Sequence, residues 1–480
     1  MQGSRGDGAL LPKAGKNRGL PGTIRDEILG RLRVVQIIVV GAGEVGYEIA
    51  ARLSRDNQNV VVIEKEPALV ERVNNTLDVL AIQGNGASAR ILEEAGVRRT
   101  SLLIAVTGLD ESNVMACMTA KRYGVKKTVA RVRNEEYGQD HTILSNEFLG
   151  IDLIINPERV AAMEIAKILK NPAATDVEYF AKGKVQTLGF RVDAEAPIVG
   201  KKIMDLPISC LIGAIARNDE ALIPGGGDII QADDTVFVIG KTGSMSAMGF
   251  LTGKSSERIR RVMIVGGGKI GYQLASRLQG HKALGFSVKL IEQRADRCRM
   301  LAEDLRDVLI LKGCGTDLEL LREEGIEEMD AFVAVTGNDE ANILSCLLAK
   351  HFGVRKVILE VNNPAYAPLV YTLGLYEAVH PRQITASLIL SLIRRESVLS
   401  VSILREDQVE VLELAIGPGF RDVNKKVRQL KLPRGILLGS IYRGKEVIIP
   451  RGDDYLLAGD RVVVITRPET ADTAAAYFTA

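Results

Sequence analysis

Two short stretches of this sequence place glycines where a nucleotide phosphate could meet the backbone. Residues 37–46 read IIVVGAGEVG and residues 262–271 read VMIVGGGKIG, so an apolar run leads into the pattern G-x-G-x-x-G in both. In a dinucleotide fold the first glycine forms the turn from strand to helix, the second admits the pyrophosphate, and the third lets the helix pack on the sheet. The glycines with these roles are Gly41, Gly43 and Gly46 in the first stretch, and Gly266, Gly268 and Gly271 in the second.

The helix that follows each turn would present its first backbone N–H groups, and the positive end of its dipole, to the phosphates. The residues between the second and third glycines are Glu44 and Val45 in the first copy, and Lys269 and Ile270 in the second. We expect Lys269 to attract a phosphate. Glu44, in the same place, has to point to solvent to avoid repelling one.

An acidic residue ends the next apolar run after each glycine turn. Glu64 follows in VVVIEKE and Glu292 in VKLIEQR. In dinucleotide-binding folds a carboxylate at this position accepts hydrogen bonds from the ribose hydroxyls. It would also repel a 2′-phosphate, so the pattern favours NAD or an adenine nucleotide over NADP.

Two further turns are predicted at the carboxyl edge of the sheet, where ligands of such folds bind. Gly84 and Asn85 lie in QGNGAS after the third predicted strand, and Gly313 and Cys314 lie in KGCGTD at the matching place. We include these four residues in the candidate sites. For the two G-x-G-x-x-G motifs the alternative is that they are only turns of a sheet and bind nothing.

The motif after the fourth predicted strand has two interpretations. It reads TGLDESN in the first copy and TGNDEAN in the second. Asp110 and Asp339 are of a residue type that caps helix N-termini, so local structure alone would explain the motif. Thr107 and Thr336 would otherwise contact the ligand.

The whole sequence repeats in this way, as two tandem units. Besides the motifs above, IPGGGDIIQADDTVFVIG at 223–240 matches IPRGDDYLLAGDRVVVIT at 449–466. In the first unit, short apolar runs alternate with amphipathic helical segments, which indicates a parallel sheet. The predicted strands are 35–40, 59–63, 79–82, 102–106, 128–132 and 152–155. The fold class is therefore α/β, with two Rossmann-like doubly wound parallel-sheet domains, each followed by a small α+β module.

The predicted domain organisation follows from the repeat. A basic, glycine-rich extension is expected to be mostly disordered. The predicted boundaries are 1–33 for this extension, 34–156 for the first Rossmann-like domain, 157–249 for the first small module, 250–258 for a linker, 259–380 for the second Rossmann-like domain, and 381–480 for the second small module.

Composition excludes several other classes of protein. The net charge of +2, the 4% of aromatic residues and the lack of Trp give no reason to expect a nucleic-acid partner. No apolar run approaches the roughly 20 residues of a membrane-spanning helix, and the N-terminus has no secretory signal. Five cysteines without a C-x-x-C pair indicate reduced thiols in a cytosolic protein. The histidines are too scattered to predict a metal site.

Taken together, the glycine turns, the acidic residues, the later turn motifs and their duplication resemble the KTN/RCK family of nucleotide-binding domains. The segment IPRGDDYLLAGDRVVVIT is similar to the small C-terminal module that accompanies those domains. The tandem arrangement resembles the peripheral NAD-binding subunits of Trk-type potassium-uptake systems. The resemblance covers residues 34 to about 470.

The resemblance implies a cytoplasmic regulatory ring attached to the inner face of the membrane. In the family the nucleotide domains assemble face to face beneath a potassium-translocating integral membrane subunit, and the bound ligand controls transport. For this chain it implies a homo-oligomer, expected to be a tetramer with eight nucleotide domains. The expected cofactor is NAD(H), with ATP or ADP as alternatives.

Three other functions compete with this one. A dehydrogenase would need a substrate domain and an acid or base near the nicotinamide. The small modules and the unmatched histidines do not supply these, so no catalytic residue is predicted. A transcription factor would need a helix with a basic face, and residues 1–33 contain no helix-turn-helix pattern. A nucleotide sensor of another cation transporter remains open, because the same glycine turn accepts ATP, ADP or NAD(H).

Overall fold

The computed structural model describes most of the chain. The described residues are 36–55, 57–138, 143–218, 220–254, 257–280, 285–393, 398–404 and 409–479. The extension predicted to be disordered, residues 1–33, lies outside them.

The first Rossmann-like domain is a six-stranded sheet in the order β3-β2-β1-β4-β5-β6, with every pair parallel. Its strands are β1 (Gln36–Val40), β2 (Asn59–Glu64), β3 (Leu80–Gln83), β4 (Thr100–Ala105), β5 (Lys127–Arg131) and β6 (Leu153–Ile155). Its helices are α2 (Glu44–Arg55), α3 (Pro67–Thr76), α4 (Ala89–Glu94), α5 (Asp110–Arg122) and α6 (Asn146–Leu149). All six predicted strands are present, within two residues of their predicted ends.

The second Rossmann-like domain repeats this topology in the order β14-β13-β12-β15-β16-β17. Its strands are β12 (Arg261–Val265), β13 (Ser287–Glu292), β14 (Val308–Lys312), β15 (Ala331–Ala334), β16 (Lys356–Glu360) and β17 (Glu377–Val379). Its helices are α9 (Lys269–Gly280), α10 (Ala295–Asp304), α11 (Leu318–Glu323), α12 (Asp339–His351) and α13 (Ala367–Thr372). The predicted α/β fold class is confirmed.

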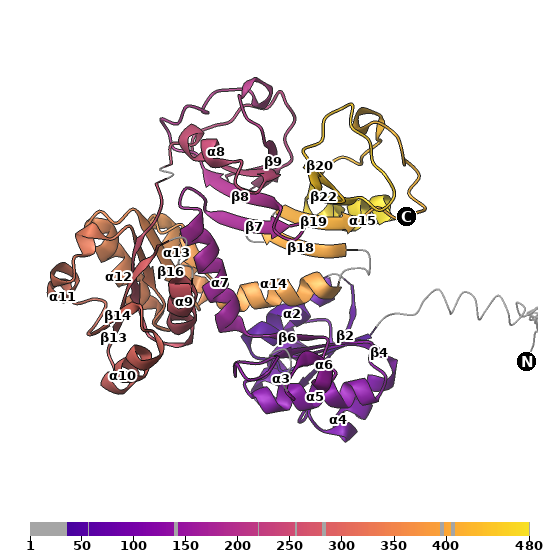
Figure 1. The fold of residues 1–480 in the computed structure, drawn as a ribbon. Coiled ribbons are helices and arrows are strands. Elements are labelled where there is room, and N and C mark those ends of the chain that lie inside the picture. The colour runs from indigo at the N-terminus through magenta and orange to yellow at the C-terminus, as the bar shows by residue number, and fades with distance from the viewer. Residues whose placement is uncertain are drawn as a thin grey trace, which may run out of the picture.

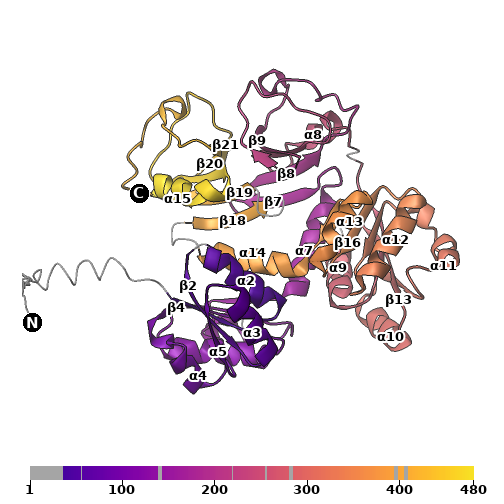
Figure 2. The same cartoon turned by 180° about the vertical axis from the view of Figure 1, so that it is seen from behind.

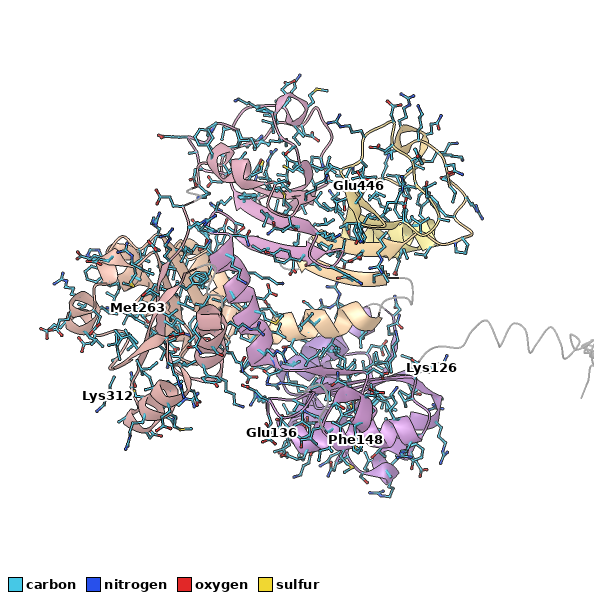
Figure 3. All side chains as sticks on the ribbon, in the orientation of Figure 1. Lys126, Glu136, Phe148, Met263, Lys312 and Glu446 are labelled. Atoms are coloured by element: carbon cyan, nitrogen blue, oxygen red, sulfur yellow. The ribbon has the colours of Figure 1, made fainter. Side chains whose placement is uncertain are left out.

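The central strands are mostly apolar because helices cover both faces of each sheet. In β1, Ile38 and Val40 face one layer of the core, and Ile37 and Val39 face the other. In β12, Met263 is fully buried, and Figure 3 labels it inside the second sheet. In both sheets the strand order changes direction between the first and fourth strands, and ligands of such sheets bind at the carboxyl side of that point.

Each unit ends in a small antiparallel module. The first contains β7 (Asp176–Phe180), β8 (Val185–Arg191), β9 (Leu211–Arg217), β10 (Glu220–Leu222), β11 (Thr235–Lys241) and α8 (Ser246–Leu251). The second contains β18 (Val398–Leu404), β19 (Val409–Ala415), β20 (Ile436–Arg443), β21 (Glu446–Ile448), β22 (Arg461–Thr466) and α15 (Ala471–Thr479). The strand orders are β10-β9-β11-β8-β7 and β21-β20-β22-β19-β18. Short 3₁₀ turns lie at Val97–Arg99, Ile203–Asp205, Ile326–Glu328, Pro364–Tyr366, Val427–Gln429 and Pro468–Thr470.

The sheets of the two small modules pack against one another, at the top of Figure 1. Gly213 lies against the side chain of Ile465, and Gly439 lies against that of Ile239. A side-chain carbon on Gly213 would come within 1.8 Å of Ile465 Cδ1, so a larger residue there would force the isoleucine side chain to move. The interface therefore repeats the twofold pattern of the sequence.

One helix of each unit packs on the sheet domain of the other. The helix α7 (Pro157–Lys170) follows β6 but places Ile165 in the core of the second Rossmann-like domain. The helix α14 (Pro381–Ile393) follows β17 but places Ile389 in the core of the first. Figures 1 and 2 show α14 along the first sheet domain and α7 beside the second. Each helix belongs to one unit by its place in the sequence and to the other by its packing. The predicted domain boundaries, which follow the sequence, therefore remain a prediction.

Candidate nucleotide-binding sites

The first glycine of each motif forms a turn that other residues adopt only with strain. Gly41 has a φ of 101° and Gly266 a φ of 104°, both in the left-handed region. The turns also lie close to the end of the fourth strand. A side-chain carbon on Gly41 would come within 3.0 Å of the Thr107 backbone nitrogen, and one on Gly266 within 2.5 Å of the Val335 carbonyl oxygen.

The second and third glycines of each motif have different surroundings. A side-chain carbon on Gly46 would lie 1.9 Å from the carbonyl oxygen of Gly41, and Gly271 repeats this value against Gly266. The third glycine is therefore required by packing alone. Around the second glycines, Gly43 and Gly268, no atom lies within 4 Å of such a carbon. This open space is what a phosphate needs to approach the backbone.

The N-termini of α2 and α9 face this space. Tyr47 N donates to the Gly43 carbonyl at 2.8 Å, and Tyr272 N is the corresponding donor in α9. The N–H groups of the three residues before each tyrosine have no acceptor within their helix, as at any helix start. The side chains of Val45 and Ile270 are buried in the core. Only the backbone of these two candidate residues is available to a phosphate.

The two predicted ribose-binding carboxylates lie at the glycine turns. Glu64 accepts a hydrogen bond from the Ala42 backbone N–H at 2.5 Å. Glu292 accepts one from Gly267 N at 2.9 Å and another from Arg294 N at 2.9 Å. Each carboxylate therefore stabilises the turn as well as facing the site. Lys65 N and Glu66 N also donate to Glu64, at 2.6 and 3.0 Å, so this carboxylate keeps fewer oxygen lone pairs for a ribose hydroxyl than Glu292 does.

The turns after β3 and β14 lie next to these carboxylate residues. Gly84 N donates to the Glu64 carbonyl at 2.8 Å, and Gly313 N to the Glu292 carbonyl at 2.9 Å. The side chain of Asn85 accepts a hydrogen bond from a backbone N–H two residues later. The structure therefore places this predicted turn beside the glutamate that ends the neighbouring strand in both copies, and its contact with a ligand stays a prediction.

Cys314 stands in the second copy where the first has Asn85. Its sulfur lies 3.1 Å from the Thr316 hydroxyl and accepts a hydrogen bond from Gln293 Nε2 at 3.1 Å. Hydrogen bonds, first from the Thr316 side chain, lower the pKa of the Cys314 thiol below its ordinary value. This group is partly exposed and has no counterpart in the first copy.

Thr107 and Thr336 are tied to their own helices by an asparagine. Asn113 Oδ1 accepts hydrogen bonds from Thr107 N at 2.9 Å and from its hydroxyl at 2.7 Å. Asn342 Oδ1 binds Thr336 in the same way, at 3.0 and 2.7 Å. Both threonines lie at the switch point of their sheets. Contact with a ligand stays a prediction for them.

The prediction that Asp110 and Asp339 cap helices is wrong. Leu109 and Asn338 occupy the N-cap positions, and each aspartate is the first residue of its helix. The Asp110 carboxylate accepts two backbone N–H groups from the loop after β5, at 2.9 and 2.8 Å. Asp339 binds the loop after β16 in the same way. The partners of each aspartate therefore lie in a loop distant along the chain, which a local sequence pattern does not reveal.

The charged residues at the two turns differ. Glu44 has an exposed side chain, as predicted, but it also pairs with the guanidinium of Arg382 in α14. Lys269, in the same place at the second turn, is exposed and has no ion pair among the described residues. Arg297 Nε donates to the Gly267 carbonyl at 2.8 Å, within the second turn.

Arg382 and Arg297 were not found by sequence reasoning. Arg382 lies far from Glu44 along the chain, and only the packing of α14 on α2 brings it there. No sequence signal in a single chain predicts that packing. Arg297 follows Glu292 closely, at a position where the first unit has Leu69. Comparison of the two copies would have found it.

The carboxyl edges of the two sheet domains face one another. Gln273 in α9 donates a hydrogen bond to Glu135 in the loop after β5. Two buried polar atoms at these edges, Arg131 Nε and Glu158 Oε2, have no hydrogen-bond partner among the described residues. Burial and the charges of nearby carboxylates raise the pKa of Glu360. These edges thus hold two buried polar atoms for which the described residues supply no partner, and a carboxyl group with a raised pKa.

These sites fit a nucleotide. The open second glycine, the free helix N-terminus and the carboxylate supply a phosphate cradle and a ribose acceptor in each copy. Among the described residues no three His, Cys, Asp or Glu side chains gather as metal ligands. Nor does any helix there combine the length and the apolar character needed to cross a membrane.

Comparison with known proteins agrees with this arrangement. The TrkA-N domain family matches residues 37–157 and 262–381, and the TrkA-C domain family matches residues 188–249 and 411–479. The chain thus belongs to the class of proteins with duplicated TrkA-N and TrkA-C domains. Among its relatives is Trk system potassium uptake protein TrkA homolog 1 of Methanosarcina mazei, 40% identical over 92% of this chain and all of the relative. A TrkA homolog of Archaeoglobus fulgidus is 37% identical over 90% of this chain and 97% of its own.

The chain therefore belongs to the TrkA family of the Trk potassium-uptake system. The solved GsuK channel bound to NAD has the same fold, with a TM-score of 0.59 at 18% identity, covering 94% of this chain and 83% of its own. The prediction that the chain is not an enzyme is confirmed by this membership, because the relatives are potassium uptake proteins.

Proposed function

We propose that the protein is the cytoplasmic, nucleotide-binding regulatory subunit of a potassium-uptake transporter. It binds NAD(H), ATP or ADP at the two glycine turns. The bound nucleotide changes the geometry of a tetrameric ring and so gates a Trk-type integral membrane subunit. The ring attaches to the inner face of the membrane through that subunit.

The observation that carries the proposal is the pair of phosphate cradles at facing sheet edges. Each combines an open glycine, Gly43 or Gly268, with a free helix N-terminus and a carboxylate at the adjacent strand end. A ligand between these edges contacts groups that belong to both units. The names of the relatives, and the NAD in the GsuK channel, support the choice of potassium transport and of a nucleotide.

The test of nucleotide binding uses the two open glycines. Gly43→Asp and Gly268→Asp place a carboxylate in each cradle, where the added side chain has room. We expect calorimetric titration to show one NADH or ATP site lost in each single variant and both lost in the double variant. Gly227→Asp is the matched control, because Gly227 is equally open and lies in the first small module. A double variant that binds nucleotide as the wild type does would refute the proposal.

The proposed tetramer has candidate contact surfaces on two matching helices. Met115 in α5 is 51% exposed, and Leu344 at the matching position in α12 is 50% exposed. Exposed apolar side chains at matching positions suit a ring in which the α5 face of one unit contacts the α12 face of another. Light scattering of Met115→Asp and Leu344→Asp should give a smaller mass than the tetramer of the wild type. A monomeric wild type at micromolar concentration would contradict the assembly.

Control of transport is tested with the membrane partner. Proteoliposomes that contain the potassium-translocating subunit should take up potassium at a rate that changes when this protein and nucleotide are added together. The Gly43→Asp/Gly268→Asp protein should bind the membranes but lose the response to nucleotide. A nucleotide response for another cation, without one for potassium, would favour the sensor of a different transporter.

A further inference from the structure

A cation from the second unit lies at the first glycine turn. Arg382 is the second residue of α14, and its guanidinium pairs with the carboxylate of Glu44, the first residue of α2. The position of Arg382 is set by packing, because Ala386 and Ile389 of the same helix are buried in the core of the first Rossmann-like domain. The guanidinium is therefore held against the side chain of the first residue of α2.

The second site has the opposite arrangement of charge. Lys269 stands where the first site has Glu44, and Glu158 begins α7 as Arg382 begins α14, each directly after a proline. Glu158 pairs with Arg133 at 3.2 Å. The second site has its base on its own glycine turn. The first site has an acidic residue there, and its basic residue, Arg382, comes from α14 of the second unit.

We propose that Arg382 is a phosphate-binding residue of the first nucleotide site, delivered by the second unit. Without nucleotide, Glu44 holds the guanidinium. When nucleotide binds, its phosphate replaces the Glu44 carboxylate as the partner of Arg382, and Glu44 turns to solvent. This inference rests on the proposed function, because it assumes that the first glycine turn binds a nucleotide.

The exchange of partners is favourable on general grounds. The side chains of Glu44 and Arg382 are 58% and 44% exposed, and ion pairs so open to water contribute little to stability. A guanidinium forms stronger, bidentate hydrogen bonds with a phosphate. The helix N-terminus of α2 attracts the same anion. Glu44 alone would repel it, so the first site needs the second unit to bind phosphate well.

The proposal also gives the first site a physical link to the rest of the ring. The helix α14 packs against α2 on one side and against α7 on another. A phosphate that binds both the α2 N-terminus and Arg382 would hold α14 to the first domain. The second site, with its own Lys269, has no such requirement.

The test measures how affinity depends on the number of phosphates. In the Gly268→Asp protein only the first site remains, and AMP, ADP and ATP are titrated into it by calorimetry. We expect Arg382→Gln to weaken ATP binding about tenfold and AMP binding less than twofold. Glu44→Gln should tighten ATP binding a few-fold, because the competing carboxylate is gone. Arg382→Lys should fall between, since lysine keeps the charge without the fork.

Arg90→Gln is the matched control. Arg90 also forms an exposed ion pair, with Glu94, on a helix of the same domain. It should leave all three affinities unchanged. A Gly268→Asp protein that binds no nucleotide would overturn the proposed function of the first site together with this inference. Unchanged ATP affinity in Arg382→Gln, or an equal loss for AMP and ATP, would overturn the inference alone and leave nucleotide binding intact.

Discussion

The two glycine turns of this chain have nearly the same backbone and different charges. In both, the first glycine has a φ near 100°, and a glutamate accepts a hydrogen bond from a backbone N–H of the turn. In both, a side-chain carbon added to the third glycine would lie 1.9 Å from a carbonyl oxygen. Glu44 pairs with Arg382 at the first turn, whereas Lys269 at the second has no ion pair within the part of the chain that the structure describes.

The comparison separates what the fold requires from what can vary. The third glycine and the glutamate are repeated because packing and turn geometry depend on them. The residue after the second glycine, Glu44 or Lys269, is open to solvent, so it can change charge without cost to the fold. The predictions below test this separation.

The largest effect is expected from the third glycine. Gly46→Ala and Gly271→Ala should each lower the free energy of unfolding by about 3 kcal/mol or more, because the new carbon meets a carbonyl oxygen that cannot move without opening the turn. Gly43→Ala and Gly268→Ala, made at the open glycines, are the controls and should cost less than about 1 kcal/mol. Denaturant unfolding measures all four. A third-glycine variant as stable as its control would show that the two turns are not built alike.

The parts of the structure predicted from sequence are those that depend on neighbouring residues. Strand positions followed from apolar runs, and the turns followed from glycines and the acidic residue at the next strand end. The small modules were recognised from the repeat of 223–240 in 449–466. The strand and turn signals lie within a few tens of residues, and the small modules were recognised from the duplication of the sequence.

The parts not predicted depend on contacts between distant segments. The apolar face of α7 shows that it is buried, but not that it covers the second domain instead of its own. Arg382 was missed for the same reason, and Asp110 was assigned to a helix cap because the loop after β5 was not considered. Glu44 was correctly expected to be exposed, but its partner could not be seen.

One difference between the units lies at the joint between sheet domain and small module. In the first unit, Lys167 Nζ lies 2.6 Å from Glu164 and 3.0 Å from Glu178 of β7. The carboxylates of Glu164 and Glu178 therefore share one lysine. A third carboxylate, that of Asp176 on the same strand, also faces this cluster. Burial and the Glu178 charge raise the pKa of Glu164 to about 7. The second unit has Leu388 in place of Glu164.

This joint should make stability depend on pH. Because the pKa of Glu164 is raised on folding from 4.5 to about 7, its contribution is fully present below pH 4.5 and is lost as the pH rises through 7. Between pH 5.5 and 8.5 the wild type should lose about 2 kcal/mol relative to Glu164→Gln. Denaturant unfolding at the two pH values measures the difference.

The control for this prediction is an acid of the same helix with an ordinary partner. Glu158→Gln keeps Glu164 and should keep the pH dependence. If Glu164→Gln loses as much stability as the wild type when the pH rises, another group causes the pH dependence. The two units would then not differ in this respect.

The ribose carboxylates should behave alike in both sites. A 2′-phosphate beside Glu64 or Glu292 meets a negative charge, so NADPH should bind about tenfold more weakly than NADH, or about 1.4 kcal/mol. Glu64→Gln and Glu292→Gln should each remove this preference at one site while the amide oxygen still accepts a turn N–H. Glu66→Gln, on the same loop, is the control. Equal affinity of the wild type for the two cofactors would refute the role given to both glutamates.

The smallest effect on nucleotide affinity is expected from Arg297, which lies at the second site and has no counterpart at the first. Its Nε bond to the Gly267 carbonyl fixes the turn, and its charge lies near the phosphate position. Arg297→Leu copies the residue of the first unit and should weaken NADH binding two- to fivefold, about 0.4–1 kcal/mol, as expected for one hydrogen bond. The titration is made in the Gly43→Asp protein, so that only the second site responds. Arg299→Leu, on the exposed side of α10, should have no effect. If Arg297→Leu binds NADH as its parent does, the second site owes its affinity to the backbone and Lys269, and the two turns are closer in function than their charges indicate.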